Sequence, residues 1–255
     1  MELTYAQKQE IFEKGVVKIP GVVPQVMVNA ALRAINHSIG EGMNVEDMVT
    51  FRARSYCPEL QKTPVITDLL NKTPAWELAE SAIGVGNIKP AGAGQIALRF
   101  PSLQDPPRKP GCHLDGMHSP HNGVPKGTIQ NFTMLVGVYL SDVPAPYCGN
   151  FTAWPGTHHI YEKYFREQGP ESLLEGMPNV ELPAPEQITG KAGDVVLTHY
   201  QIAHGAAPNV SPHVRYAIFF RLRHINHDAV RMEVMTNLWL EWDGMQSIVN
   251  ERNAG

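Results

Sequence analysis

The sequence predicts a mainly β protein with flanking helices, in which a double-sheet jelly roll carries N-terminal helices on its larger sheet. Apolar residues recur at helical spacing through much of the first ninety residues. From about Gln95 the chain changes to short apolar or alternating segments separated by Gly, Pro and Asn. About eight of these segments have the character of strands, which is the number expected of a jelly roll.

Three helices are predicted in the N-terminal part. The first lies between Thr4, which has the spacing of a capping box with Gln7, and Gly15, which can end the helix in a left-handed turn. The second covers residues 24–39, where apolar residues form one continuous stripe. The third begins at residue 74, where a proline follows a capping threonine, and ends before the glycine at residue 84.

Five strands are predicted from apolar or alternating segments, and three shorter ones are expected at residues 112–115, near 186–189 and through His204. The five segments are QIALRF, TIQNFTMLVGVYL, GNFTAW, GDVVLTH and RYAIFFRL. In RYAIFFRL one face carries Tyr216, Ile218, Phe220 and Leu222. So apolar a face must be buried against other apolar side chains, and the apolar stripes on the N-terminal helices can supply them.

We expect the chain to form one domain over residues 1–255. Its parts are a mostly helical region at 1–90, a β core at 91–228 and a C-terminal segment at 229–255. Within the core, residues 155–184 are polar and interrupted by Pro and Gly, with a short helix predicted at about 158–168. This insertion is expected at the mouth of the barrel, where substrate contacts concentrate.

Composition excludes several classes of protein. A net charge of −4 is wrong for a nucleic-acid-binding protein. Three cysteines without C-x-x-C spacing indicate neither a disulfide framework nor a thiolate zinc site. No apolar run approaches the length of a membrane span, and the N-terminus is unlike a signal peptide. We therefore expect a cytoplasmic protein with a small-molecule partner, and the oligomeric state stays open.

The segment PGCHLDGMHSPHN, residues 110–122, contains a candidate metal site. In a strand, His113 and Asp115 would point to the same face. With a distant histidine they would complete a two-histidine, one-carboxylate triad, which leaves coordination positions open for oxygen chemistry. Since the chain has 11 histidines, chance alone predicts roughly a third of one such H-x-D match, so the pair is weak by itself.

His204 and Arg215 form the second candidate pair. They flank a short turn between two predicted strands, which would place them on neighbouring strands. A buried arginine in such a position requires an anion, and a carboxylate is its natural bidentate partner. Either a protein carboxylate or a dicarboxylate cosubstrate would satisfy it.

The order of these motifs carries a resemblance to a known family. H-x-D, then GNFTAWPGTHH, then GDVVLTHYQIAHGAAPNVSPHVRYAIFFRL resembles the phytanoyl-CoA dioxygenase family of iron(II)/2-oxoglutarate-dependent oxygenases. The likeness covers most of the chain, including the opening IFEKGVVKIPGVV. It implies a double-stranded β-helix fold, that is, a cupin-like jelly roll.

The resemblance also implies a chemistry and its residues. His113, Asp115 and His204 are implied as ligands of Fe2+, and Arg215 as the residue that binds the distal carboxylate of 2-oxoglutarate. With O2 as second cosubstrate, such an enzyme hydroxylates a substrate and releases succinate and CO2. The presence of Asp115 argues against halogenation, because related halogenases lack that carboxylate.

One position departs from the family pattern. Ala206 stands where family members often carry a serine or threonine that helps to hold the cosubstrate. Thr133, Tyr139 and Arg99 lie on predicted strands and are possible replacements, with Arg99 favoured. Three further residues are predicted to contact substrate: Gln95, His118 and Trp154.

Two alternatives stay open at this point. Two histidines and a carboxylate also describe a catalytic zinc hydrolase, and a non-catalytic jelly-roll binding protein would have the same fold. The sequence contains no evident basic cluster for the phosphates of coenzyme A, so we expect a small or medium organic metabolite as substrate. The remaining histidines are expected in a turn, at strand ends and at exposed positions, without a chemical role: His158, His159, His199, His213, His224 and His227.

Overall fold

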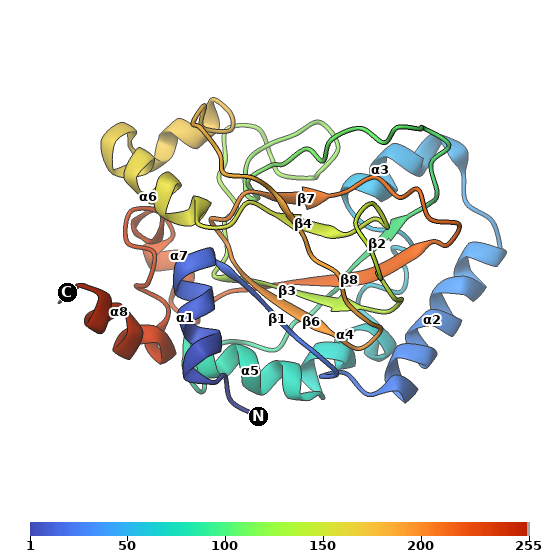
Figure 1. The fold of residues 1–255 in the computed structure, drawn as a ribbon, viewed down its shortest axis with the longest axis horizontal. Coiled ribbons are helices and arrows are strands. Elements are labelled where there is room, and N and C mark those ends of the chain that lie inside the picture. The colour runs from blue at the N-terminus through green and yellow to red at the C-terminus, as the bar shows by residue number, and fades with distance from the viewer. Residues whose placement is uncertain (254–255) are drawn as a thin grey trace.

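The computed structural model describes residues 1–253 and confirms the predicted jelly roll. Five antiparallel strands form the larger sheet in the order β1-β6-β3-β8-β2, and three form the smaller sheet in the order β5-β4-β7. Figure 1 shows the smaller sheet as a separate layer beside the larger one. The strands are β1 (Val16–Ile19), β2 (Gln95–Arg99), β3 (Met134–Tyr139), β4 (Phe151–Ala153), β5 (Glu186–Gln187), β6 (Val195–His199), β7 (His204–Ala206) and β8 (Arg215–Leu222).

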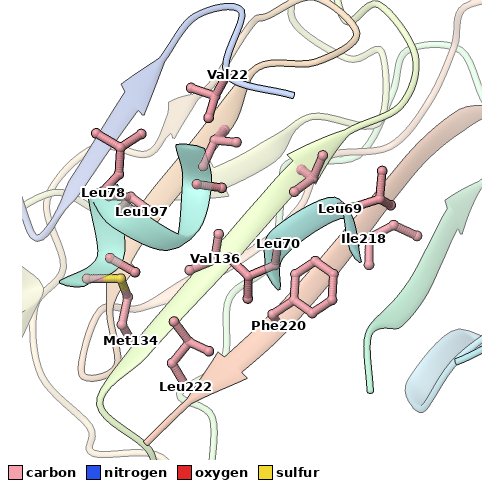
Figure 2. Packing of buried hydrophobic residues seen from close by; sticks show 14 of the residues in the cluster. Val22, Leu69, Leu70, Leu78, Met134, Val136, Leu197, Ile218, Phe220 and Leu222 are labelled. Atoms are coloured by element: carbon pink, nitrogen blue, oxygen red, sulfur yellow. The ribbon is translucent and has the colours of Figure 1, made fainter. Parts of the chain in front are cut away.

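Helices cover the outer face of the larger sheet, as predicted. The apolar face of β8 packs with side chains of β3 and β6 against residues such as Leu69 and Leu78 (Figure 2). A second apolar cluster, which includes Tyr139 and Phe151, fills the space between the two sheets. The main helices are α1 (Tyr5–Lys14), α2 (Gln25–Gly40), α3 (Met48–Ala53), α4 (Pro64–Asn71), α5 (Pro74–Ile83), α6 (Thr157–Gln168), α7 (His227–Val230) and α8 (Gln246–Asn253).

The first helix is capped as its sequence predicts. The hydroxyl of Thr4 accepts a hydrogen bond from the backbone N–H of Gln7 (3.2 Å), and the Gln7 side chain accepts one from the backbone N–H of Thr4 (2.8 Å). Gly15 ends α1 with a φ of 74°, in the left-handed region. A side chain on Gly15 would also collide with the ring of His158. Both the backbone conformation and the lack of space therefore require glycine at this position.

Three predictions of secondary structure were wrong in detail. Strand β1 was missed, although it pairs with β6 at the edge of the larger sheet. The strand predicted at residues 128–140 begins only at Met134. Residues 112–115 form no strand, because His113 makes a single β-bridge with His204 and the chain then turns at Asp115. Within residues 1–253, no helix has the length and hydropathy that a membrane span requires.

The C-terminal segment packs onto a buried group of aromatic rings. His199 stacks on Trp242 (ring centroids 5.1 Å apart) and meets Trp239 edge-on at 5.3 Å. His158 lies 5.4 Å from His199 and is fully buried. His199 lies at the end of β6, as predicted, but His158 lies in the first turn of α6 rather than in the turn before it. The rings of both belong to the protein interior, as does that of His227.

We predict that the buried His199 makes folding stability fall in mild acid. Burial lowers the pKa of His199 from 6.5 to about 4, so the folded protein favours the neutral ring. Its contribution is complete above pH 6.5 and is lost as the pH falls toward 4, by about 1.4 kcal/mol for each pH unit. Urea unfolding at pH 7 and pH 5 should show this loss in the wild type.

The matched variants are His199→Gln and His37→Gln. His37 is exposed on α2, and its replacement is the control for the loss of an imidazole at the surface. His199→Gln should flatten the dependence between pH 7 and pH 5 by about 2 kcal/mol. If the free energy of unfolding depends on pH in the same way in the wild type and in His199→Gln, His199 is not the source of the acid sensitivity.

Candidate metal centre and its pocket

A cavity of about 590 Å³ opens between the sheets, and three potential metal ligands lie in its wall. His113 Nε2 is 3.0 Å from Asp115 Oδ1, and His204 Nε2 is 3.9 Å from the same oxygen. One ligand atom from each of the three side chains lies within 4.8 Å of the others. Ligand distances of about 2.1 Å place neighbouring ligands of an octahedral ion about 3 Å apart, so the three side chains fit a single metal ion.

A β-bridge, rather than the predicted strand, brings the two histidines together. The N–H of His113 donates to the carbonyl of His204 (2.9 Å), and the N–H of His204 donates to the carbonyl of His113 (3.1 Å). The rings then lie side by side, with centroids 4.5 Å apart. Gly205 permits this approach, because a Cβ at that position would collide with the carbonyl oxygen of Gly111.

The surroundings of His204 keep its ring neutral, as a metal ligand requires. Its Nδ1 lies 3.0 Å from the carbonyl oxygen of Ile202, which can only accept a hydrogen bond, so the proton belongs on Nδ1. Nε2 then presents its lone pair to the site. Burial, aided by the neighbouring His113, lowers the pKa of His204 to about 4, which keeps the ring neutral at physiological pH.

Arg221 orients the carboxylate of Asp115. Its Nε donates to Asp115 Oδ2 (3.0 Å), and its Nη2 lies 2.9 Å from the same oxygen in an ion pair. Burial by itself would raise the pKa of Asp115, but Arg221, His113 and His204 outweigh burial and hold this pKa well below its usual range. Oδ2 is therefore engaged by the guanidinium, while Oδ1 faces the two histidines.

Gln95 and Phe132 support Arg221 in turn. The Gln95 side-chain oxygen accepts a hydrogen bond from Arg221 Nη1 (2.8 Å), and the guanidinium carbon lies 5.6 Å from the centre of the Phe132 ring. Gln95 was predicted to contact substrate, and it does line the pocket. Its hydrogen bond to Arg221 gives it a second role, in holding the arginine that holds Asp115.

Arg215 lies in the wall of the same pocket, with only 2% of its surface exposed. Its Nε donates to the carbonyl of Gly149 (2.7 Å) and its Nη1 to that of Ala97 (2.9 Å), which fixes the guanidinium plane. Burial and the nearby Arg99 lower its pKa to about 9. No carboxylate among residues 1–253 forms a salt bridge with Arg215, so a buried charge is left for a ligand to neutralise.

Arg99 and Ala206 also line the pocket, as the sequence analysis expected. Arg99 is the direct cross-strand partner of Arg215, so the two guanidinium groups start from neighbouring backbone positions. Tyr139, the other possible source of a hydroxyl, donates instead to the carbonyl of Ile188 (3.0 Å) and lies in the apolar cluster between the sheets.

Three predicted site residues lie outside the pocket lining. Thr133 was predicted to bind cosubstrate, but its hydroxyl donates to the buried carboxylate of Glu241 (2.6 Å) because its strand face points toward the C-terminal segment. Trp154 is a core residue between the sheets. His118 is exposed and is 2.6 Å from the carbonyl oxygen of Val124, which turns its ring toward the surface loop. These are corrections to the sequence-based site.

The insertion at residues 155–184 is also not part of the pocket lining. Its helix α6 buries Tyr161 and Phe165 in the cluster between the sheets, so its apolar side chains serve the core rather than a substrate. The region that does reach the pocket is the end of α3, which contributes Arg52 and Arg54. These arginines were not predicted, because α3 is distant in the chain from the candidate metal ligands and carries no motif.

These features define a class of protein. A jelly roll with two histidines and one carboxylate facing an open cavity is the arrangement of non-heme iron(II) oxygenases. The chain belongs to the phytanoyl-CoA dioxygenase family, whose model matches residues 12–217. The protein is therefore an iron(II)- and 2-oxoglutarate-dependent oxygenase.

Solved structures share the fold. HygX from Streptomyces hygroscopicus, in a structure with nickel and 2-oxoglutarate bound, is 19% identical, with a TM-score of 0.58 and 88% of each chain covered. The carbocyclase SnoK from nogalamycin biosynthesis is 18% identical, with a TM-score of 0.50 and 90% of each chain covered. The epimerase SnoN from the same biosynthesis is 17% identical, with a TM-score of 0.54, covering 86% of this chain and 82% of SnoN. No curated protein matches the chain.

We predict that Arg221→Gln weakens metal binding about 10- to 100-fold, the usual cost of losing a partner that orients a metal ligand. The glutamine cannot supply both the hydrogen bond and the ion pair that Arg221 makes with Asp115 Oδ2, so the carboxylate loses its fixed orientation. Calorimetric titration with nickel(II) measures the affinity. Arg33→Gln, at an exposed position on α2, is the control. Equal affinities in the wild type and Arg221→Gln would show that Arg221 does not position Asp115.

Proposed function

We propose that the enzyme hydroxylates a small or medium organic metabolite, with 2-oxoglutarate and O2 as cosubstrates and succinate and CO2 as products. In this proposal His113, Asp115 and His204 hold the iron, and Arg215 binds the distal carboxylate of 2-oxoglutarate. One observation carries the proposal: a ligand group for one metal ion and a buried arginine without an acidic partner line the same cavity.

Iron(II) bound at such a triad supplies the activation of O2 that the reaction requires. The chain itself orients the ligands and limits access of water. His204 Nε2 and Asp115 Oδ1 are directed to a common point by Ile202 and Arg221. Apolar side chains of Leu135, Phe151 and Phe219 line the cavity and keep water from the reacting centre.

The cosubstrate is proposed to enter with its distal carboxylate toward Arg215. Two N–H groups of Arg215 are engaged by backbone carbonyls, which leaves its remaining donors for the carboxylate. Ala206 offers no hydroxyl there, and Arg99, directly across the strand pair, is the second donor in our proposal. An arginine in place of a hydroxyl would give the carboxylate a second charged partner.

Other reactions of the triad are less well supported. The zinc hydrolase and the binding protein considered from the sequence would not require a buried arginine without an acidic partner. Two of the structural neighbours, SnoK and SnoN, are a carbocyclase and an epimerase. Hydroxylation is nevertheless our proposal, because it requires nothing beyond the triad, the cosubstrate and a bound C–H group. Identification of the oxidised product decides between these outcomes.

We predict that Asp115→Ala abolishes succinate formation from 2-oxoglutarate in the presence of iron(II) and ascorbate. Activity should fall by more than about 100-fold, because loss of an outer partner of a metal ligand alone costs about 10- to 100-fold. Succinate is measured by chromatography, with and without a metabolite mixture. Asp228→Ala, at an exposed carboxylate of α7, is the matched control and should keep wild-type activity. Undiminished, iron-dependent turnover in Asp115→Ala would refute the triad.

A further inference from the structure

The pocket carries more positive charge than the proposed reaction uses. Six arginines line it, together with one carboxylate and no lysine. Arg221 is neutralised by Asp115, and Arg215, with Arg99 as the second donor, is assigned to 2-oxoglutarate. The other three are Arg52, Arg54 and Arg223. The whole chain has a net charge of −4, so this accumulation does not reflect its general composition.

The excess of positive charge is greatest at Arg99 and Arg215. They are direct partners across the β2–β8 pair, and like charges placed opposite each other destabilise a sheet. Arg99 donates a hydrogen bond to the carbonyl of Leu98 (3.1 Å). Burial lowers its pKa, and the charges of Arg52 and Arg108 lower it further. No salt bridge between Arg99 and an acidic residue is found in residues 1–253.

The end of α3 adds two more guanidinium groups on the β2 side of the pocket. The chain after α3 runs beside β2, since the N–H of Tyr56 donates to the carbonyl of Ile96 (2.9 Å). This contact brings Arg52 and Arg54 to the pocket wall near Arg99. Arg54 is held by a hydrogen bond from its Nε to the carbonyl of His121 (3.1 Å). Neither arginine has an acidic partner within the described chain.

Arginine is suited to recognise planar or tetrahedral oxyanions, because its guanidinium offers paired donors in a fixed geometry. Arg52 and Arg54 are exposed, so their donors are accessible to a ligand that enters the pocket, and a negative charge on that ligand would be attracted to them. In the sequence Arg52 and Arg54 lie far from Arg99 and Arg215, which is why no basic cluster was evident. The expectation against an acyl-coenzyme A substrate therefore loses its basis.

We propose that the substrate carries an anionic group, a phosphate or a carboxylate, that binds to Arg52 and Arg54 on the α3 side of the pocket. This inference rests on the proposed function, since it assigns Arg215 and Arg99 to the cosubstrate. The anionic group would orient the substrate from one side, so that its reacting carbon faces the metal ligands. An uncharged metabolite would leave the guanidinium groups of Arg52 and Arg54 without counter-charge.

The test uses protein loaded with nickel(II) and 2-oxoglutarate, into which inorganic phosphate or acetate is titrated at low ionic strength in a calorimeter. We expect at least one of the two anions to bind, and the stronger one identifies the substrate's anionic group. Binding should weaken at least fivefold in the double variant Arg52→Gln/Arg54→Gln. The charge-preserving double variant Arg52→Lys/Arg54→Lys should retain most of it, and Arg33→Gln should bind as the wild type does.

Two results would overturn the inference: no binding of either anion to the wild type, or equal binding to the wild type and the double glutamine variant. Circular dichroism of each variant excludes misfolding as the cause of lost binding. The first step, binding of 2-oxoglutarate to the nickel-loaded wild type, tests the proposed function separately. If that step fails while phosphate binding still follows Arg52 and Arg54, the proposed function is refuted and the anion site stands.

Discussion

The arrangement of the site depends on strand β8, whose side chains point alternately toward the helices and toward the pocket. Ile218 and Phe220 face the helices and fasten the strand in the outer apolar cluster. Arg215 and Arg221 face the pocket, and six residues along a strand separate them by about 20 Å. One end of the strand therefore presents an arginine without an acidic partner, while the other orients Asp115. Any shift of register by one residue would move both arginines into the apolar layer.

Charge is managed differently at the two ends of this strand. At Arg221 the compensation is internal, since Asp115 and Gln95 both bind the guanidinium. At Arg215 backbone carbonyls fix the geometry, and the charge stays uncompensated within the described chain. A buried charge without a partner is costly, and such sites are commonly places where a ligand completes the structure. This asymmetry distinguishes the end of the pocket that is proposed to bind the metal from the end that is proposed to bind the cosubstrate carboxylate.

Sequence patterns predicted well those parts in which local chemistry determines the structure. The capping box at Thr4, the proline at the start of α5 and the alternation in β8 all specify local geometry, and the structure confirms them. The triad residues do converge, although the reason was wrong. His113 is placed by a two-hydrogen-bond bridge to His204, made possible by Gly205, and a bridge of that kind leaves no periodic signal in the sequence.

Residues whose role depends on distant contacts could not be assigned from the sequence. Thr133 lies on the expected strand boundary, yet its hydroxyl binds Glu241 from the C-terminal segment, a contact over more than one hundred positions. Arg52 reaches the pocket because the chain that follows α3 runs alongside β2. Arg221 was within reach of sequence reasoning, since it shares the strand face of Arg215. The division into one domain, the cytoplasmic location and the absence of nucleic-acid binding stay predictions.

The most direct test of the proposed site is a crystal structure of the protein with nickel(II) and 2-oxoglutarate. We predict one metal ion bound by His113 Nε2, Asp115 Oδ1 and His204 Nε2, with ligand distances of about 2.1 Å. The distal carboxylate of 2-oxoglutarate should lie on the guanidinium of Arg215. A metal ion bound by other residues, or a cosubstrate carboxylate that makes no contact with Arg215, would contradict the assignment.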